Sequence, residues 1–188
     1  LAAGESRRMG RCKPLMEWDG KTWLAHALDR FHDAGCDEVV GVVSKAAPAR
    51  EASARFVQVD QIHLGMLHSV QCATAVLPGR AALMVCPCDM PALSTQTVRT
   101  VRSAIADDRI VVPTWNGRRG HPIAIGCDLV KKVMQMDARH HGLDRLLKTE
   151  ALRVRTVPVD DPACVVDFDT PEDWLRFCET LKEGKRDG

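Results

Sequence analysis

Short apolar runs alternate with amphipathic stretches along the chain, and this alternation limits the possible folds more than any other feature. The β-rich runs span residues 38–44, 54–60, 81–86, 109–115, 121–126 and 152–159. Several of them contain a continuous apolar stretch rather than an alternating pattern, which predicts strands that are covered on both faces. Stretches with an apolar period of about 3.6 residues predict helices near 22–35, 65–77, 94–106, 127–136, 142–149 and 171–182. We therefore predict an α/β sandwich around a mainly parallel sheet.

One connection departs from the strand–helix alternation. The segment NGRRG, residues 116–120, joins two strand-like runs, and Asn-Gly between strands is a strong hairpin signal. The sheet is therefore expected to be mixed, with an antiparallel part late in the chain. Because the sequence shows no repeat and no low-complexity linker, residues 1–182 are expected to form a single domain and residues 183–188 a polar tail.

Composition and charge exclude several classes of protein. The 188 residues carry a net charge of +1, which argues against a whole surface built for nucleic acid or for an anionic membrane. No apolar run reaches about 18 residues, so no transmembrane helix is expected. The eight cysteines are scattered except for Cys86 and Cys88, which predicts thiols of a cytoplasmic protein. Because the chain begins at Leu1 rather than at Met, we expect an upstream stretch that includes the first half of a strand.

The first loop, LAAGESRRMGRCK, combines glycines with basic residues. It has neither the G-x-G-x-x-G pattern of dinucleotide-binding loops nor the Walker A spacing. A loop that wraps an anion needs bare backbone together with positive charge. We therefore predict that Gly4 admits a base or ribose and that Ser6 and the N–H groups around Gly10 bind phosphate. Arg8 and Lys13 are expected to supply charge, and a solvated basic turn is the alternative.

Three carboxylates stand out because ordinary structural roles do not account for them. Asp89 follows the apolar run 81–86 between two prolines, which places it at the carboxyl edge of the predicted sheet. It could cap the next helix, but Ser94 is the better N-cap. In the segment DFDTPEDW, the part TPED is a helix start. This leaves Asp167 and Asp169, which alternate along an extended segment and so point to one face.

The pattern L-A-A-G-x-S-x-R-M-G-x-x-K resembles the signature loop of the small nucleotidyltransferases, and among them the MobA-like NTP transferases that include molybdenum cofactor cytidylyltransferases. The matching residues are Leu1, Ala2, Ala3, Gly4, Ser6, Arg8, Met9, Gly10 and Lys13. The resemblance implies a three-layer α/β/α, Rossmann-like nucleotidyltransferase fold of the GT-A-like type. It also implies a loop that wraps the base and triphosphate of an NTP, with Lys13 on the phosphates. Guanylyl-transferring relatives usually read L-A-G-G, so Ala3 favours cytidylyl transfer.

The same resemblance assigns roles to the carboxylates. It makes Asp89 a ligand of a catalytic Mg²⁺ and places a second metal carboxylate in the segment 167–169. We favour Asp169 over Asp167 because it immediately precedes the helix cap, and both stay candidates. Carboxylates at strand ends suit Mg²⁺, a hard ion that takes oxygen ligands and bridges to phosphates.

Two further segments resemble substrate loops of these enzymes. In GRRGHP, residues 117–122, the side chains of Arg118, Arg119 and His121 are expected to face an anionic acceptor, since guanidinium groups match phosphate geometry. A solvated basic turn is the alternative. In HLGMLHSV, Ser69 is expected to contact the ribose or a phosphate, with an ordinary core helix as the equal alternative.

Together these features predict a Mg²⁺-dependent enzyme that transfers CMP from CTP to the terminal phosphate of molybdopterin and releases pyrophosphate. Arg8, Lys13 and Asp89 are its expected catalytic residues, and a molybdenum hydroxylase is a possible protein partner. One alternative is a guanylyltransferase or a sugar- or polyol-phosphate cytidylyltransferase of the same fold. Another is a nucleotide-binding accessory protein without catalysis. A metal or redox protein built on Cys86 and Cys88 is the third.

Overall fold

A mixed sheet of five strands is the centre of the computed structural model, which describes residues 1–45, 54–77, 79 and 81–184. Its strands are β5 Leu83–Val85, β6 Ile110–Trp115, β7 Arg118–Arg119, β8 Ile123–Ile125 and β9 Val154–Pro158. β9 pairs with β6 in parallel, whereas β8 lies antiparallel between β5 and β6. β5, β6 and β9 consequently run in the same direction, and β8 and β7 run against them. The prediction of a mixed, mainly parallel sheet is confirmed.

The predicted hairpin is present, in a form shorter than expected. β6 and β7 pair at Trp115 and Arg118, and the two residues between them, Asn116 and Gly117, have φ values of 48° and 76°. Two left-handed residues are what the tight turn of a two-residue hairpin requires. β7 ends after two residues, and the returning strand β8 pairs with the beginning of β6, where Ile125 lies opposite Ile110.

The N-terminal segment joins this sheet to a second, smaller pair of parallel strands, β3 Val40–Val43 and β4 Arg55–Gln58. The backbone N–H of Ala2 donates to the Val42 carbonyl at 2.7 Å. On the other side, the amino group of Leu1 donates to the Cys86 carbonyl at 2.6 Å. The predicted first strand is thus a single bridge between Ala2 and Val43. It brings the first loop to the edge of the sheet where β3 and β5 end.

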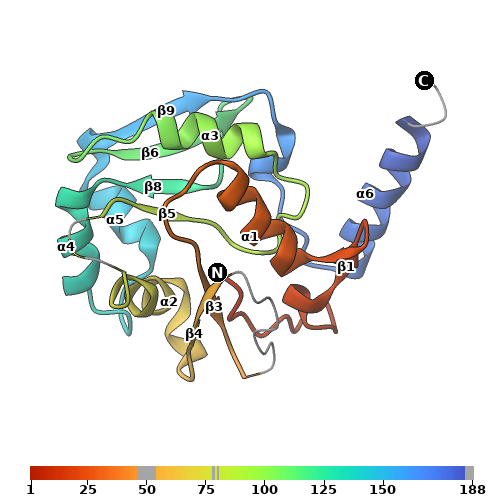
Figure 1. Cartoon of the computed structure of the whole chain (residues 1–188), viewed down its shortest axis with the longest axis horizontal. Coiled ribbons are helices and arrows are strands. Elements are labelled where there is room, and N and C mark those ends of the chain that lie inside the picture. Colours follow the sequence, from red (N-terminus) through yellow and green to blue (C-terminus); the bar gives the residue numbers. More distant parts are fainter. Residues whose placement is uncertain (46–53, 78, 80, 185–188) are drawn as a thin grey trace.

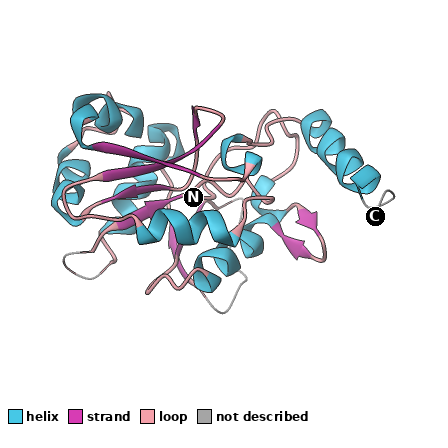
Figure 2. Cartoon of the chain, turned by 90° about the horizontal axis from the view of Figure 1, so that it is seen from above, coloured by secondary structure: helices cyan, strands magenta, loops and turns pink. Residues whose placement is uncertain are grey.

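Helices cover both faces of the sheet (Figures 1 and 2). They are α1 Trp23–Asp33, α2 Gly65–Thr74, α3 Thr95–Ser103, α4 Cys127–Gln135, α5 Leu143–Thr149 and α6 Pro171–Gly184. Successive residues of β6 point to opposite faces of the sheet, and the residues on each face pack against different helices. Ile110 and Val112 pack in one core cluster with α2, α4 and α5, whereas Val111 packs in another with Val101 of α3. Apolar side chains on both faces confirm the three-layer α/β/α arrangement.

Capping side chains define several helix starts, and those at Ser94 and Thr170 are predicted from the sequence. The Thr22 hydroxyl accepts the Ala25 N–H at 3.0 Å, and the Ser94 hydroxyl accepts the Thr97 N–H at 3.1 Å. Thr170 makes a reciprocal pair of bonds with Asp173 at the start of α6. Each bond satisfies a backbone group that the first helical turn leaves open.

Short elements complete the described chain. They are the strands β1 Glu17–Trp18 and β2 Lys21–Thr22 and the 3₁₀ turns η1 Lys13–Leu15, η2 Ile62–Leu64, η3 Ala151–Arg153 and η4 Pro162–Val165. The last helix, α6, runs to Gly184 and extends away from the sheet, whereas the sequence predicts its end at residue 182 (Figures 1 and 2). Residues 185–188 of the predicted tail lie outside the described residues. Within the described chain, none of the helices has the length and apolar character that crossing a bilayer requires.

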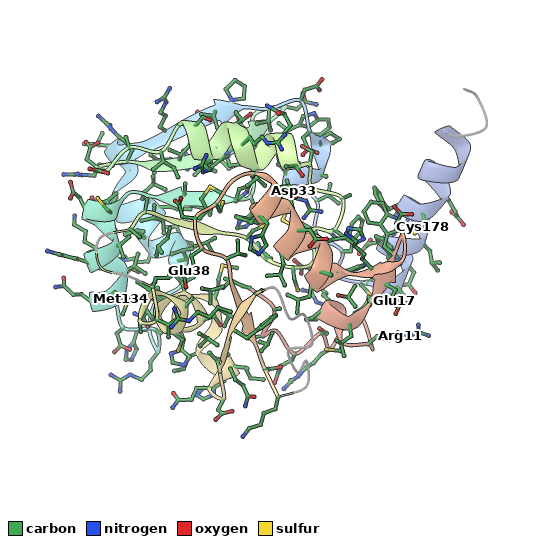
Figure 3. All side chains as sticks on the ribbon, in the orientation of Figure 1. Arg11, Glu17, Asp33, Glu38, Met134 and Cys178 are labelled. Carbon is green, nitrogen blue, oxygen red and sulfur yellow. The ribbon has the colours of Figure 1, made fainter. Side chains whose placement is uncertain are left out.

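An aromatic cluster ties α6 to the N-terminal part of the chain. Met9, Trp23 and Phe168 are buried in it, and Trp18 and Trp174 pack around them. Ring centroids lie 4.9 Å apart for Trp23 and Trp174 and 5.1 Å apart for Phe168 and Trp174. Figure 3 labels Glu17 of β1 and Cys178 of α6, the two elements that carry Trp18 and Trp174 of this cluster. Edge-to-face contacts of this kind add to the area that the rings bury.

Candidate active site

The first loop has a defined shape that its own hydrogen bonds maintain. Ser6 and Gly10 adopt left-handed φ values of 52° and 66°. The Met9 N–H donates to the Ser6 carbonyl at 3.1 Å, and the Ser6 hydroxyl accepts the Lys13 N–H at 3.1 Å. Met9 is 3% exposed and anchors the loop in the aromatic cluster. The loop therefore has a defined backbone shape, although most of residues 4–11 are exposed to solvent.

A cleft of about 360 Å³ lies between this loop, the start of α2 and the segment after β5. The predicted nucleotide-binding residues that line it are Leu1, Ala2, Ala3, Gly4, Ser6, Lys13 and Ser69, and they are joined by Arg8, Asp89 and Asp169. Gly10 does not line the cleft, and its N–H donates to the Arg7 carbonyl at 3.3 Å. The N–H of Gly10 is thus directed to the backbone of its own turn, which Gly10 forms with a positive φ. This differs from the prediction that N–H groups around Gly10 bind phosphate.

Lys13 sits at the centre of the charged groups. Its ammonium nitrogen lies 2.8 Å from Oδ2 of Asp89 and 2.7 Å from Oδ1 of Asp169. Arg8 binds the other oxygen of Asp169 at 2.7 Å. The Lys13 side chain is 11% exposed, whereas that of Arg8 is 70% exposed. The sequence assigns Lys13 to phosphates, but in this structure it bridges the two carboxylates.

The pKa directions agree with a charged network. The hydrogen bond from Lys13 is the main cause that lowers the pKa of Asp169, and Arg8 contributes in the same direction. Burial alone would lower the pKa of Lys13, but the hydrogen bonds to Asp169 and Asp89 outweigh it and raise that pKa. Lys13 and Asp169 therefore each stabilise the charged form of the other.

The three predicted metal carboxylates meet at this point, and they fit a divalent cation. Asp89, Asp167 and Asp169 offer oxygens that lie within 4.8 Å of one another, and they form the one such acidic, histidine or cysteine group found among the described residues. Oδ1 of Asp89 is buried and has no hydrogen-bond partner. Because a buried carboxylate oxygen without a partner is unfavourable, it is suited to a cation that shares the site.

Backbone contacts bring these carboxylates together from distant parts of the chain. The Phe168 N–H donates to the Asp89 carbonyl at 3.1 Å, which brings the segment that carries Asp167 and Asp169 next to Asp89. On the far side of the loop, the buried guanidinium of Arg30 in α1 donates to the carbonyls of Met90 and Pro91. Arg30 thus supports the segment that carries Asp89.

Sequence reasoning missed Arg30, although a signal was present. Arg30 follows Trp23 and Ala27 at helical spacing and precedes Ala34, so it falls on the stripe that faces the core. A basic residue in such a stripe needs buried acceptors, and here they are the two carbonyls of the Asp89 loop.

The predicted acceptor residues lie on the short strand β7 and just after it. Arg118 and Arg119 are exposed on β7, and Arg118 donates to the Val165 carbonyl at 3.4 Å. His121 is mostly buried, and its Nδ1 has no hydrogen-bond partner. Burial is the main cause that lowers its pKa, against opposing effects of the Val85 carbonyl and the charge of Asp89. None of the three predicted acceptor residues lines the cleft of the first loop.

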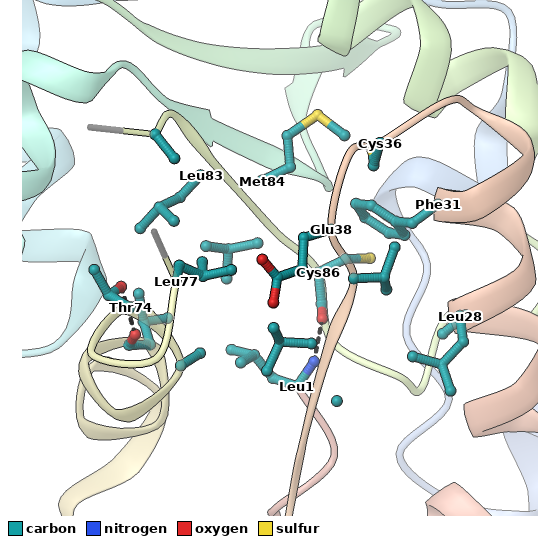
Figure 4. A pocket seen from close by; sticks show the side chains of 18 of the residues that line it. Leu1, Leu28, Phe31, Cys36, Glu38, Thr74, Leu77, Leu83, Met84 and Cys86 are labelled. Carbon is teal, nitrogen blue, oxygen red and sulfur yellow. Dashed lines mark hydrogen bonds between the residues drawn. The ribbon is translucent and has the colours of Figure 1, made fainter. Parts of the chain in front are cut away.

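A larger cavity of about 910 Å³ lies between β3 and β5, next to the amino group of Leu1 (Figure 4). The carboxylate of Glu38 points into it among mainly aliphatic side chains. Its lining contains neither Lys13 nor any of the three clustered carboxylates. Lys13, Asp89 and Asp169 line the smaller cleft instead.

The cysteine pair does not form a reactive centre. Cys86 and Cys88 are both buried, and burial raises the pKa of these thiols to about 11 and about 12. Thiols with such values are neutral near neutral pH and bind metals poorly in that form. The structure thus gives no support to a cysteine-based metal or redox function.

Among the named relatives of the chain, two are nucleotidyltransferases and one is an oxidoreductase. The chain is 25% identical to the molybdenum cofactor cytidylyltransferase of Escherichia coli K12, over 97% of this chain and 95% of that protein. It is also 25% identical to the molybdenum cofactor guanylyltransferase of Shewanella sp. ANA-3, with the same coverage of 97% and 95%. The nicotine blue oxidoreductase of Paenarthrobacter nicotinovorans is 29% identical over 94% of this chain and 93% of that protein.

A solved structure and a family model agree with these relatives. Rv0371c from Mycobacterium tuberculosis H37Rv superposes with a TM-score of 0.83 at 26% identity over 95% of each chain, and its complex with manganese gives 0.76 at 25% over the same shares. The family model of the MobA-like NTP transferase domain matches residues 1–157. The chain therefore belongs to the MobA-like NTP transferase family and is a nucleotidyltransferase.

Proposed function

We propose that this protein transfers CMP from CTP to the terminal phosphate of molybdopterin. A phosphate oxygen of the acceptor would attack the α-phosphorus of CTP, the bond to the bridging oxygen of the β-phosphate would break, and pyrophosphate would leave. The observation that carries the proposal is the cluster of Lys13, Asp89 and Asp169 at the edge of a cleft built by the first loop.

The residues of the cleft divide into those that admit the nucleotide and those that meet its charge. A Cβ at Gly4 would contact nothing within 4 Å, so open space lies at the point where a base or ribose would approach. Arg8 and Lys13 supply positive charge beside that space. Asp89, Asp167 and Asp169 would hold Mg²⁺, which would neutralise phosphate charge and orient the triphosphate.

The choice of cytidine rests on Ala3. This residue is 6% exposed and lines the cleft. The resemblance to the signature loop places glycine at this position in guanylyl-transferring enzymes. A methyl group there narrows the space beside the base, which favours the smaller pyrimidine. Guanylyl transfer is the alternative, since the named cytidylyl and guanylyl relatives are equally similar to the chain.

For the acceptor, we propose that Arg118 and Arg119 bind the anionic pterin from the neighbouring hairpin, because both guanidinium groups are exposed and available to an anion. His121 is too buried for direct contact and would instead support the hairpin. A molybdenum hydroxylase would receive the finished cofactor.

The test is pyrophosphate release from CTP in the presence of molybdopterin and Mg²⁺. We expect Asp89→Ala to lower turnover by more than about a hundredfold, because it removes a direct metal ligand rather than an outer partner. Asp160→Ala, which removes an exposed carboxylate, serves as the matched control and should retain activity. Near-normal turnover of Asp89→Ala with an intact fold would refute the metal assignment.

The 29% identity to nicotine blue oxidoreductase favours oxidoreductase activity as a second candidate. Against it, the first loop lacks the G-x-G-x-x-G fingerprint of dinucleotide binding. Oxidation of NADH or NADPH with a quinone-like dye as acceptor discriminates the two. Dye reduction that survives Asp89→Ala, together with absent pyrophosphate release, would favour the oxidoreductase.

A further inference from the structure

Lys13 takes the place between two carboxylates that a metal ion would share. We propose that Lys13 is an internal counter-cation, which holds Asp89 and Asp169 together before the metal arrives and moves to the triphosphate once the metal replaces it. This inference rests on the proposed function, since it requires metal and nucleotide to meet in one cleft.

The contacts of Lys13 support a placeholder role. Its ammonium group lies within 2.8 Å of both carboxylates and is almost fully enclosed, so it neutralises them at the centre of the cluster. It leaves Oδ1 of Asp89 buried without a partner, so the ammonium does not satisfy the whole donor set. A divalent ion carries twice the charge and takes several oxygen ligands at once. The same carboxylate oxygens cannot hold both cations at these distances, because the two positive charges repel each other.

The backbone of Lys13 is held in place, whereas its side chain is free to change partners. The Ser6 hydroxyl accepts its N–H at 3.1 Å, and Lys13 begins the short turn η1, in which Pro14 follows directly. The flexible four-carbon side chain can therefore change partners while the loop stays in place. Lys13 lines the cleft together with Gly4 and Ser69, so the space for a triphosphate is within reach of its ammonium group.

Arg8 does not duplicate this role. It contacts only Asp169 among the clustered carboxylates, from a position that is 70% exposed. Its charge is therefore shielded by solvent and lies to one side of the site.

Binding of metal and nucleotide is consequently cooperative. When the metal binds alone, the displaced ammonium group of Lys13 has no new anionic partner. When a triphosphate is also bound, its phosphates provide that partner. Removal of the Lys13 charge should therefore tighten binding of the metal alone, by about 5- to 150-fold if the coupling has the usual size for linked sites. The same change should lower turnover, because the phosphates then lose a cation.

The experiment measures Mn²⁺ binding by electron paramagnetic resonance in nucleotide-free protein. The variants are Lys13→Met, which is apolar, and Lys13→Gln, which keeps a hydrogen-bond donor and serves if the first variant is unstable. Lys21→Met is the control, because Lys21 is exposed and pairs with Asp29 outside the cleft. It changes the net charge by the same amount.

We expect tighter Mn²⁺ binding in both Lys13 variants and unchanged binding in the control. Equal or weaker binding in the Lys13 variants, with binding intact in the wild type, would overturn the counter-cation role and leave the proposed function standing. If no form of the protein binds Mn²⁺, the metal assignment of the proposed function fails and the role of Lys13 fails with it.

Discussion

His121 is a partly buried base beside Asp89 and Asp167, and its surroundings affect how stability depends on pH. Burial lowers its pKa, so the unfolded chain takes up a proton more readily than the folded protein does. The stability that this histidine contributes is complete above its ordinary pKa of about 6.5 and is lost as the pH falls through the lowered value.

We therefore expect His121→Gln to flatten the pH dependence of unfolding below about pH 6.5. The measurement is the urea midpoint of wild type and variant at several pH values between neutral and mildly acidic. His140→Gln is a matched control, because His140 is exposed. A wild type whose midpoint is the same throughout that range would contradict the lowered pKa.

At the level of single residues, the sequence predicted types of side chain better than their contacts. Asp89, Asp167 and Asp169 stand out because local roles do not account for them, and the structure does bring them together. The bridge from Lys13 could not be predicted, since its partners lie 76 and 156 positions away along the chain. For Gly10, the sequence predicted phosphate binding, whereas the structure shows a residue with a positive φ in a turn. Both roles favour glycine, so the sequence alone does not separate them.

Among the elements, α3 depends on a side chain from a distant turn. Asp161 precedes η4, is 8% exposed and accepts bonds from the Ser94 N–H at 2.9 Å, the Thr97 hydroxyl at 2.7 Å and the Ala163 N–H at 3.0 Å. It therefore fastens the start of α3 to the segment that leads to the metal carboxylates.

Asp161→Ala should lower the free energy of unfolding by about 2–4 kcal/mol, because it leaves several buried donors without a partner. The neighbouring exposed residue provides the control, and Asp160→Ala should change the stability by less than about 0.5 kcal/mol. Chemical denaturation followed by circular dichroism measures both. Equal effects of the two substitutions would show that the bonds of Asp161 carry little weight.

Helix starts were more predictable than strands for a physical reason. The caps at Thr22, Ser94 and Thr170 are formed within three residues, so the local sequence contains both partners. Strand pairing is decided between distant segments. The first strand, expected to end in LAAG, is accordingly a single bridge at Ala2, and the hairpin strand β7 stops after Arg119.

In the whole molecule, the aromatic cluster connects the first loop to the carboxylates near the end of the chain. Met9 of the loop and Phe168 between the two aspartates are buried in it, and Trp174 of α6 packs against Phe168. The position of the metal carboxylates relative to the loop therefore depends on this packing.

Trp174→Ala should cost about 3 kcal/mol of stability, at the low end of values for buried aromatic residues because Trp174 is half-buried. It should also weaken nucleotide binding, since Asp169 loses its support. Leu175→Ala is the control, because Leu175 is 59% exposed and should have little effect. Thermal unfolding measures the stability, and nucleotide titration measures the affinity. A destabilised variant with unchanged nucleotide affinity would show that the aromatic cluster does not position the site.

We expect the cleft of the first loop to bind a nucleoside triphosphate together with a divalent metal. Calorimetric titration of the wild type and of Asp89→Asn with CTP, GTP and ATP, with and without Mg²⁺, measures this binding. We expect binding that prefers CTP, requires Mg²⁺ and weakens by at least about tenfold in the variant, as the loss of a metal ligand implies. Absence of binding by all three nucleotides, or binding that is indifferent to both Mg²⁺ and Asp89, would contradict the claim.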